Sequence, residues 1–119
     1  GAAKEYHSGK DNSILLKHGY APIEQYDAHG KQGPWTDVYS LCGSIFYLLT
    51  GRKPQRAYER VSEDKMVSLR QMGVHISEEK SQAVEKGLSV QIEDRYQQMA
   101  DLYYDLYGET LSGEMGKQS

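Results

Sequence analysis

The stretch GYAPIEQY, residues Gly19 to Tyr26, places a carboxylate, Glu24, among apolar and aromatic residues. Its glycine and proline make the stretch too irregular for a strand, and it is too short for a stable isolated helix. Burying an ionised carboxylate is costly unless a cation meets it. The sequence therefore predicts a cationic partner for Glu24 elsewhere in the chain, and it raises the question of what such a pair would hold together.

Other residue types that could do chemistry are sparse. The four histidines show no HxxxH spacing, and no CxxC pair is present, so we expect no metal site. A single cysteine excludes an internal disulfide and fits a reducing compartment. Because Cys42 lies in an apolar run, a small buried thiol is favoured over a nucleophile. The histidines are His7, His18, His29 and His75.

The composition limits the classes of function. The chain has 119 residues, which suits one domain or part of one, and 38% of them are apolar. Ten residues are tyrosine, against one tryptophan and one phenylalanine, so several core hydroxyls need partners. The net charge of −3, with no dense basic patch, argues against a nucleic-acid partner. There is no signal-peptide pattern and no apolar run of membrane-spanning length.

The strongest helix signal is WTDVYSLCGSIFYLLTG, residues 35–51. Pro34 precedes it, Thr36 is a candidate cap, and the carboxylate of Asp37 suits the first turn. Gly51 should end the helix, with Pro54 shortly after it. The helix is apolar nearly all the way round, which predicts a position in the middle of the domain. It is too short to span a membrane, which needs roughly 20 residues.

Three weaker amphipathic helices are predicted over residues 62–72, 77–86 and 93–107, each ending at a glycine. Residues 1–20 suggest an exposed, irregular loop that docks through Ile14 to Leu16. We find no alternation of the strand type, so the predicted fold class is all-α. Three amphipathic helices cannot easily cover every side of a buried helix. Together with the absence of an initiator methionine, this leads us to expect a piece of a larger protein.

Four stretches resemble a protein kinase of the bacterial serine/threonine type. GYAPIEQY resembles the Ala-Pro-Glu motif that ends the activation segment, and WTDVYSLCGSIFYLLTGRKP resembles helix F of the C-lobe. EDRYQQM resembles the stretch between helices H and I, and GAAKEY looks like the residues that follow the magnesium-binding Asp-Phe. They occur in the family's order and cover Gly1 to about Tyr107. The resemblance implies a single partial domain, the lower half of a kinase C-lobe, with helices EF to I. Its parts are an activation segment (1–26), a helical subdomain (27–107) and a flexible tail (108–119).

The resemblance also assigns roles to residues. In kinases the motif glutamate pairs with the arginine before the last helix, which here implies the pair Glu24–Arg95. Without the family order these would be two unrelated surface charges. Asp37 is similar to the invariant aspartate of helix F that anchors the catalytic loop, although complementing the helix dipole would explain it too. Lys17, His18, Gly19 and Tyr20 fall in the substrate-docking region.

Two features of the stretch before Gly19 bear on this resemblance. Serine/threonine kinases usually carry a threonine seven residues before the motif glutamate, where this chain has Lys17 followed by His18. A weakly active or inactive parent therefore stays open. Tyr6, Ser8 and Ser13 lie where kinases accept activating phosphates, but ordinary loop hydroxyls explain them as well.

The chain lacks the Gly-rich loop, the Val-Ala-x-Lys strand and the His-Arg-Asp loop on which phosphoryl transfer depends. We therefore expect no catalytic residue, no metal and no cofactor in this chain, with ATP and magnesium bound only by a full-length parent. Expected partners are a protein substrate and the remainder of the kinase domain, in the cytoplasm. We also expect a homodimer through residues 14–16 or the helix at 35–51. The alternative is a non-catalytic interaction module, derived from a pseudokinase or acting as a scaffold.

Overall fold

The structure is a computed structural model that describes residues 19–26 and 30–108. Within these ranges every regular element is helical, which confirms the all-α prediction. The elements in chain order are η2 (Ile23–Gln25), α3 (Pro34–Thr50), α4 (Ala57–Ser62), α5 (Glu78–Gly87), η3 (Ile92–Asp94) and α6 (Met99–Tyr107).

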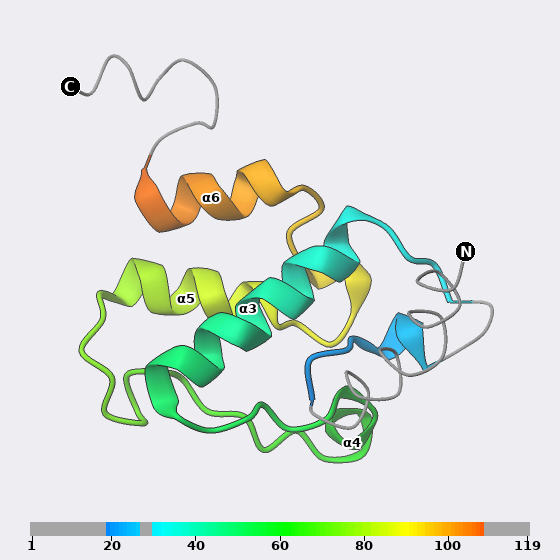
Figure 1. Ribbon diagram of the computed structural model, residues 1–119, viewed down its shortest axis with the longest axis horizontal. Coiled ribbons are helices and arrows are strands. Elements are labelled where there is room, and N and C mark those ends of the chain that lie inside the picture. Colours follow the sequence, from blue (N-terminus) through cyan, green and yellow to red (C-terminus); the bar gives the residue numbers. More distant parts are fainter. Residues whose placement is uncertain (1–18, 27–29, 109–119) are drawn as a thin grey trace, which may run out of the picture.

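The long helix α3 forms where its end signals predict it, within one residue at each end. Pro34 occupies the first helical position, and the hydroxyl of Thr36 accepts a hydrogen bond from the Gly33 amide at 3.2 Å. Gly51 adopts the left-handed conformation, φ +74°, and its amide donates to the Tyr47 carbonyl at 2.7 Å. Figure 1 shows α3 running diagonally across the molecule, between α6 above it and α4 below it.

The core lies between α3, α5 and α6, which pack against one another. Gly87, at the end of α5, lies against Cys42 so closely that a Cβ at this position would collide with the cysteine sulfur. A glycine is therefore needed where α3 and α5 cross. The buried apolar residues of this core include Val38, Tyr39, Cys42, Phe46, Ala83, Val84, Leu88 and Leu102.

One face of α3 is not covered by the part of the chain that the structure describes. Asp37, Leu41, Ser44 and Leu48 follow one another at helical spacing, and all four are exposed. Leu48 keeps 79% of its surface accessible, an unusual value for a leucine in the central helix of a domain. None of the described helices is both long and apolar enough to cross a membrane.

The predicted helix at 62–72 is wrong. Helix α4 ends at Ser62, residues 63–68 are irregular, and a turn follows that ends at Gly73 with φ +91°. Side chains satisfy the backbone here in place of a helix: Asp64 accepts from the Met66 amide at 3.1 Å, and Glu85 accepts from the Leu69 amide at 3.3 Å. Such side-chain bonds compete with helix formation.

The predicted helix at 77–86 is present as α5, and the hydroxyl of Ser77 accepts from the Lys80 amide as a cap. The predicted helix at 93–107 is shorter than expected. A single turn, η3, comes first, Arg95 is extended with ψ 160°, and α6 begins only at Met99. Arg95, in the extended stretch before α6, is buried and donates a hydrogen bond to Glu24.

Candidate functional site

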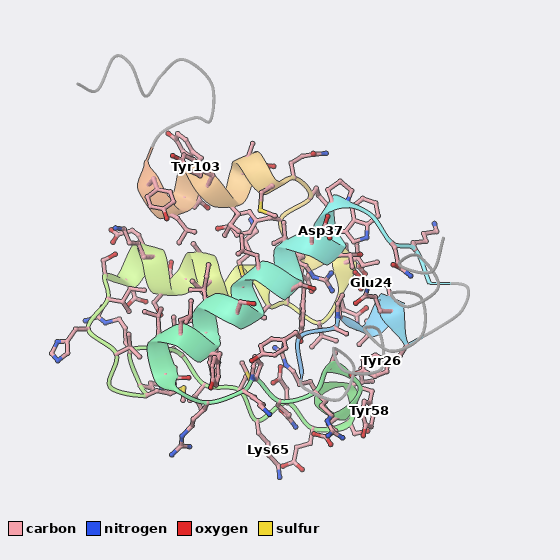
Figure 2. The ribbon with its side chains drawn as sticks, in the orientation of Figure 1. Glu24, Tyr26, Asp37, Tyr58, Lys65 and Tyr103 are labelled. Atoms are coloured by element: carbon pink, nitrogen blue, oxygen red, sulfur yellow. The ribbon has the colours of Figure 1, made fainter. Side chains whose placement is uncertain are left out.

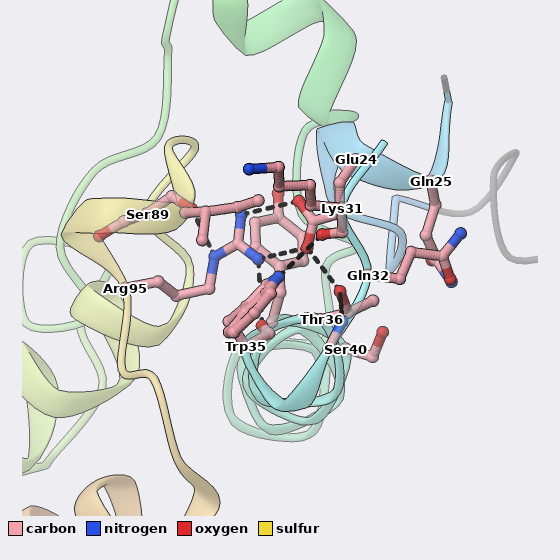
Figure 3. A network of polar contacts seen from close by, with 12 residues as sticks. Glu24, Gln25, Lys31, Gln32, Trp35, Thr36, Ser40, Ser89 and Arg95 are labelled. Atoms are coloured by element: carbon pink, nitrogen blue, oxygen red, sulfur yellow. Dashed lines mark hydrogen bonds and ion pairs between the residues drawn. The ribbon is translucent and has the colours of Figure 1, made fainter. Parts of the chain in front are cut away.

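The structure brings Glu24 and Arg95 together although 71 residues separate them in the chain. Arg95 Nη1 lies 2.7 Å from Glu24 Oε2, and Nη2 lies 3.3 Å from Oε1, so the contact has two points (Figure 3). Glu24 is 4% exposed and Arg95 is 2% exposed. A planar guanidinium matches the two oxygens of a carboxylate, and a buried pair of this geometry is strongly directional.

Every N–H of the Arg95 guanidinium has an acceptor. Nε donates to the Ser89 carbonyl, Nη1 to the Trp35 carbonyl and Nη2 to the Val90 carbonyl, each at 3.0 Å, in addition to the two bonds to Glu24. Arginine has five such donors, so none is left over for a substrate. The arrangement holds segments together and performs no acid–base or nucleophilic chemistry.

Thr36 completes the environment of the carboxylate. Its hydroxyl donates to Glu24 Oε2 at 2.7 Å, on the same oxygen that Arg95 Nη1 contacts. The pair therefore joins three parts of the chain: η2, the first turn of α3, and the stretch between α5 and α6 (Figure 3). The sequence indicates Thr36 only as a candidate helix cap, and its bond to Glu24 was not predicted.

Gly19 and Tyr20, from the predicted docking region, lie against α3 and the segment that follows it. Gly19 is buried with φ +83°, and a Cβ there would collide with the Pro54 carbonyl. The carbonyl of Tyr20 accepts a hydrogen bond from the Ser40 hydroxyl at 3.0 Å. Lys17 and His18 lie outside the described residues, as do the candidate phosphosites Tyr6, Ser8 and Ser13.

Asp37 lies in the first turn of α3, at the end of the helix that is near Glu24 (Figure 2). Its side chain is exposed, on the same face as Leu41 and Leu48. Asp37 is thus not part of the buried pair, and it faces outward with the uncovered side of α3.

A second buried guanidinium was not predicted. Arg60 contacts Asp64 at two points, Nε to Oδ1 at 3.0 Å and Nη2 to Oδ2 at 3.1 Å. Its Nη1 donates to the hydroxyl of Tyr39 at 3.1 Å, and Arg95 lies over the ring of that tyrosine, 4.9 Å from its centre. The i, i+4 spacing of Arg60 and Asp64 was a usable signal, but the predicted helix began at Ser62 and separated the two residues.

Burial and neighbouring groups shift the pKa values of Tyr39 and Asp64 in this second cluster. Burial raises the pKa of Tyr39, although Arg60 and Arg95 oppose the shift. Partial burial would raise the pKa of Asp64, but hydrogen bonds from Arg60 and the Met66 amide, with the charge of Arg60, hold it below its ordinary value. Both groups belong to a cluster that joins the C-terminal end of α4 to α3 through Arg60 and Tyr39. In the described ranges, no group of three or more His, Cys, Asp or Glu residues could hold a metal ion.

Comparison with known proteins gives one informative similarity. No protein-family model and no curated protein matches the chain. A solved structure described as the apo form of PpkA-294, a kinase fragment, is 35% identical in sequence, with a TM-score of 0.73. The similarity covers 87% of this chain and 36% of that one, so this chain spans about a third of its neighbour. The described residues have the fold of the lower half of a kinase C-lobe.

Proposed function

We propose that this chain is the activation-segment and lower C-lobe part of a serine/threonine protein kinase. In the parent it would build the floor on which a protein substrate docks, and it would anchor the catalytic loop. The observation that carries the proposal is the buried pair Glu24–Arg95, which fastens residues 19–26 to the helical base. Similarity to a kinase fragment over 87% of the chain supports the same conclusion.

In this proposal the two sides of α3 have different tasks. The side near Glu24 receives the docking segment, through Thr36 and Ser40. The exposed face beside it, about a quarter of a turn round the helix, carries Asp37 and the uncovered leucines, and it would pack against the catalytic loop and the rest of the lobe. Residues that bind ATP and magnesium would come from that remainder, in a cytoplasmic kinase. The chain by itself would then be inactive.

The test uses a kinase that contains this segment together with the upstream catalytic motifs. We expect Asp37→Asn to lower kcat for peptide phosphorylation, because the catalytic loop loses its anchor. Tyr20→Ala should instead raise KM for the peptide. Lys80→Ala, on the exposed surface of α5 and away from both faces of α3, is the control and should change neither. A parent with no transfer activity, or an unchanged kcat for Asp37→Asn, would contradict the proposal.

A complementary experiment tests the isolated chain. Thermal unfolding is followed while magnesium and ATP are titrated, and we expect no shift in the midpoint. A ligand that binds only the folded state must raise the midpoint in a saturable way. A saturable rise of several degrees would therefore show that this chain has a nucleotide site of its own.

A second candidate function, a non-catalytic interaction module, is favoured by the exposed apolar face of α3. Leu41 is 41% exposed and Leu48 is 79% exposed. Contiguous apolar surface on a soluble chain commonly becomes an interface. For the isolated chain we propose a homodimer through this face. Light scattering over a dilution series should show a dimer that Leu48→Lys converts to a monomer, whereas a wild-type monomer at every concentration would contradict it.

A further inference from the structure

Thr36, Ser40 and Gly43 share one face of α3, because they are spaced by four and three residues. This face receives the segment Gly19–Tyr26. Thr36 donates to the side chain of Glu24 at 2.7 Å, and Ser40 donates to the backbone carbonyl of Tyr20 at 3.0 Å. The segment therefore runs antiparallel to α3: the first turn of the helix contacts Glu24, and the next turn contacts Tyr20.

Gly43 extends the same face by one further turn. A Cβ on Gly43 would lie 3.1 Å from Cδ1 of the Tyr20 ring, which is tighter than an ordinary van der Waals contact. The glycine thus leaves room for the ring beside the helix. The backbone of Tyr20 is bound by Ser40, and its ring packs over the turn that follows.

The hydroxyl of Ser40 is directed in an unusual way for a residue inside a helix. Serine and threonine within helices commonly donate back to the carbonyl four residues earlier. Thr50 of the same helix does so, with its hydroxyl 2.8 Å from the Phe46 carbonyl. Ser40 donates instead across to Tyr20. Its hydroxyl therefore holds a second segment of the chain against the helix.

The ion pair alone cannot set the position of this segment. Arg95 contacts Glu24 only through the end of a long side chain, so it holds the segment at one place. The hydrogen bonds inside the segment, from the Gln25 amide to Pro22 and from the Tyr26 amide to Ile23, are local. Ser40 supplies a second anchor, on the backbone, four residues before the first.

We infer that Thr36 and Ser40 are positioning residues that fix the register of the segment Gly19–Tyr26 on α3. Losing either hydroxyl should free the segment locally, while the packing of α3 on α5 and α6 stays intact. That this register serves substrate docking rests on the proposed function, but the register itself does not. A docking surface must be held rigidly to be effective, which is the reason for two anchors.

The test measures amide hydrogen exchange in the full chain. In Ser40→Ala, which loses one hydrogen bond, we expect the Gln25 and Tyr26 amides to exchange roughly five- to tenfold faster. Thr36→Val also loses the bond that its hydroxyl accepts from the Gly33 amide, so its acceleration should be at least as large. The Leu88 amide, bonded to the Val84 carbonyl at the end of α5, should keep its rate. Thr36→Ser keeps the hydroxyl and should restore the wild-type rates. Ser44→Ala is the matched control.

Unchanged rates at Gln25 and Tyr26 in both variants would overturn the inference. Equal acceleration at Leu88 would do so as well, because it would indicate a loss of global stability. If Thr36→Val does not fold, Ser40→Ala provides the same test with a smaller change. Peptide KM in the parent kinase separates this inference from the proposed function. If Ser40→Ala accelerates exchange but leaves KM unchanged, the inference about the register holds and the role of the segment in substrate docking is contradicted.

Discussion

Replacing Arg95 by alanine should remove a large part of the stability of the fold. The variant leaves the carboxylate of Glu24, 4% exposed, with only Thr36 as a donor. The Trp35, Ser89 and Val90 carbonyls lose a donor as well. Stranding one member of a buried ion pair costs about 3–5 kcal/mol. Since a small domain is stable by about 5–15 kcal/mol, this loss is a large fraction of the total.

The assay is urea unfolding followed by circular dichroism, for Arg95→Ala, Glu24→Ala and the double variant. The coupling energy from this cycle isolates the interaction, because the double variant no longer contains a stranded charge. Arg70→Ala is the matched control. Its pair with Glu78 has a similar length, 2.8 Å, but the two side chains are 53% and 59% exposed. An exposed pair contributes about 0–1 kcal/mol, so the control should lose little.

Two results would refute this reasoning. If Arg95→Ala costs no more than Arg70→Ala, the guanidinium is not stabilising the buried carboxylate. If the two single changes add strictly in the double variant, the side chains do not interact in solution. Should Arg95→Ala be unfolded in water, Glu24→Gln keeps the shape of the side chain but removes its charge and replaces one acceptor oxygen by an amide donor. A loss below about 1 kcal/mol in Glu24→Gln would then be the refuting result.

Three further predictions concern other parts of the fold. Burial raises the pKa of the Cys42 thiol to about 12, so a thiol reagent at pH 8 should modify it only as fast as the chain unfolds; rapid modification without urea would contradict this. The pKa of Asp64 is depressed beside Arg60, so its stabilisation is present above the unfolded pKa of about 3.9 and is lost as the pH falls through the folded pKa. Because Asp64 is 45% exposed, solvent screening limits this to about 1 kcal/mol, and Asp64→Asn should lose less stability than wild type between pH 7 and pH 3 in urea unfolding. Gly19→Ala should cost more in the same assay than Gly51→Ala, since both have positive φ but only Gly19 faces a steric collision; equal losses would argue against the packing of Gly19.

The helices with clear end signals could be predicted from sequence. Pro34 and Gly51 bound α3, and Ser77 caps α5, because a missing amide, a left-handed glycine and a side-chain acceptor act on the nearest turn. The irregular path of residues 63–73 could not be predicted in this way. Some of the competing partners there are local, as in the bond from the Met66 amide to Asp64, but the Leu69 amide is bonded to Glu85, 16 residues away.

Part of the candidate site could likewise be predicted from the sequence, and part depends on the tertiary structure. The sequence alone determined that Glu24, in an apolar setting, needs a cation, since an unpaired buried charge is too costly. Its order of motifs suggested Arg95, but the three carbonyls around that arginine and the hydroxyl of Thr36 come from the tertiary structure. So do the contacts of Arg60 with Tyr39 and of Ser40 with Tyr20. The last two bonds join residues 21 and 20 positions apart, and only the packing of α3 against its neighbours brings their atoms within reach.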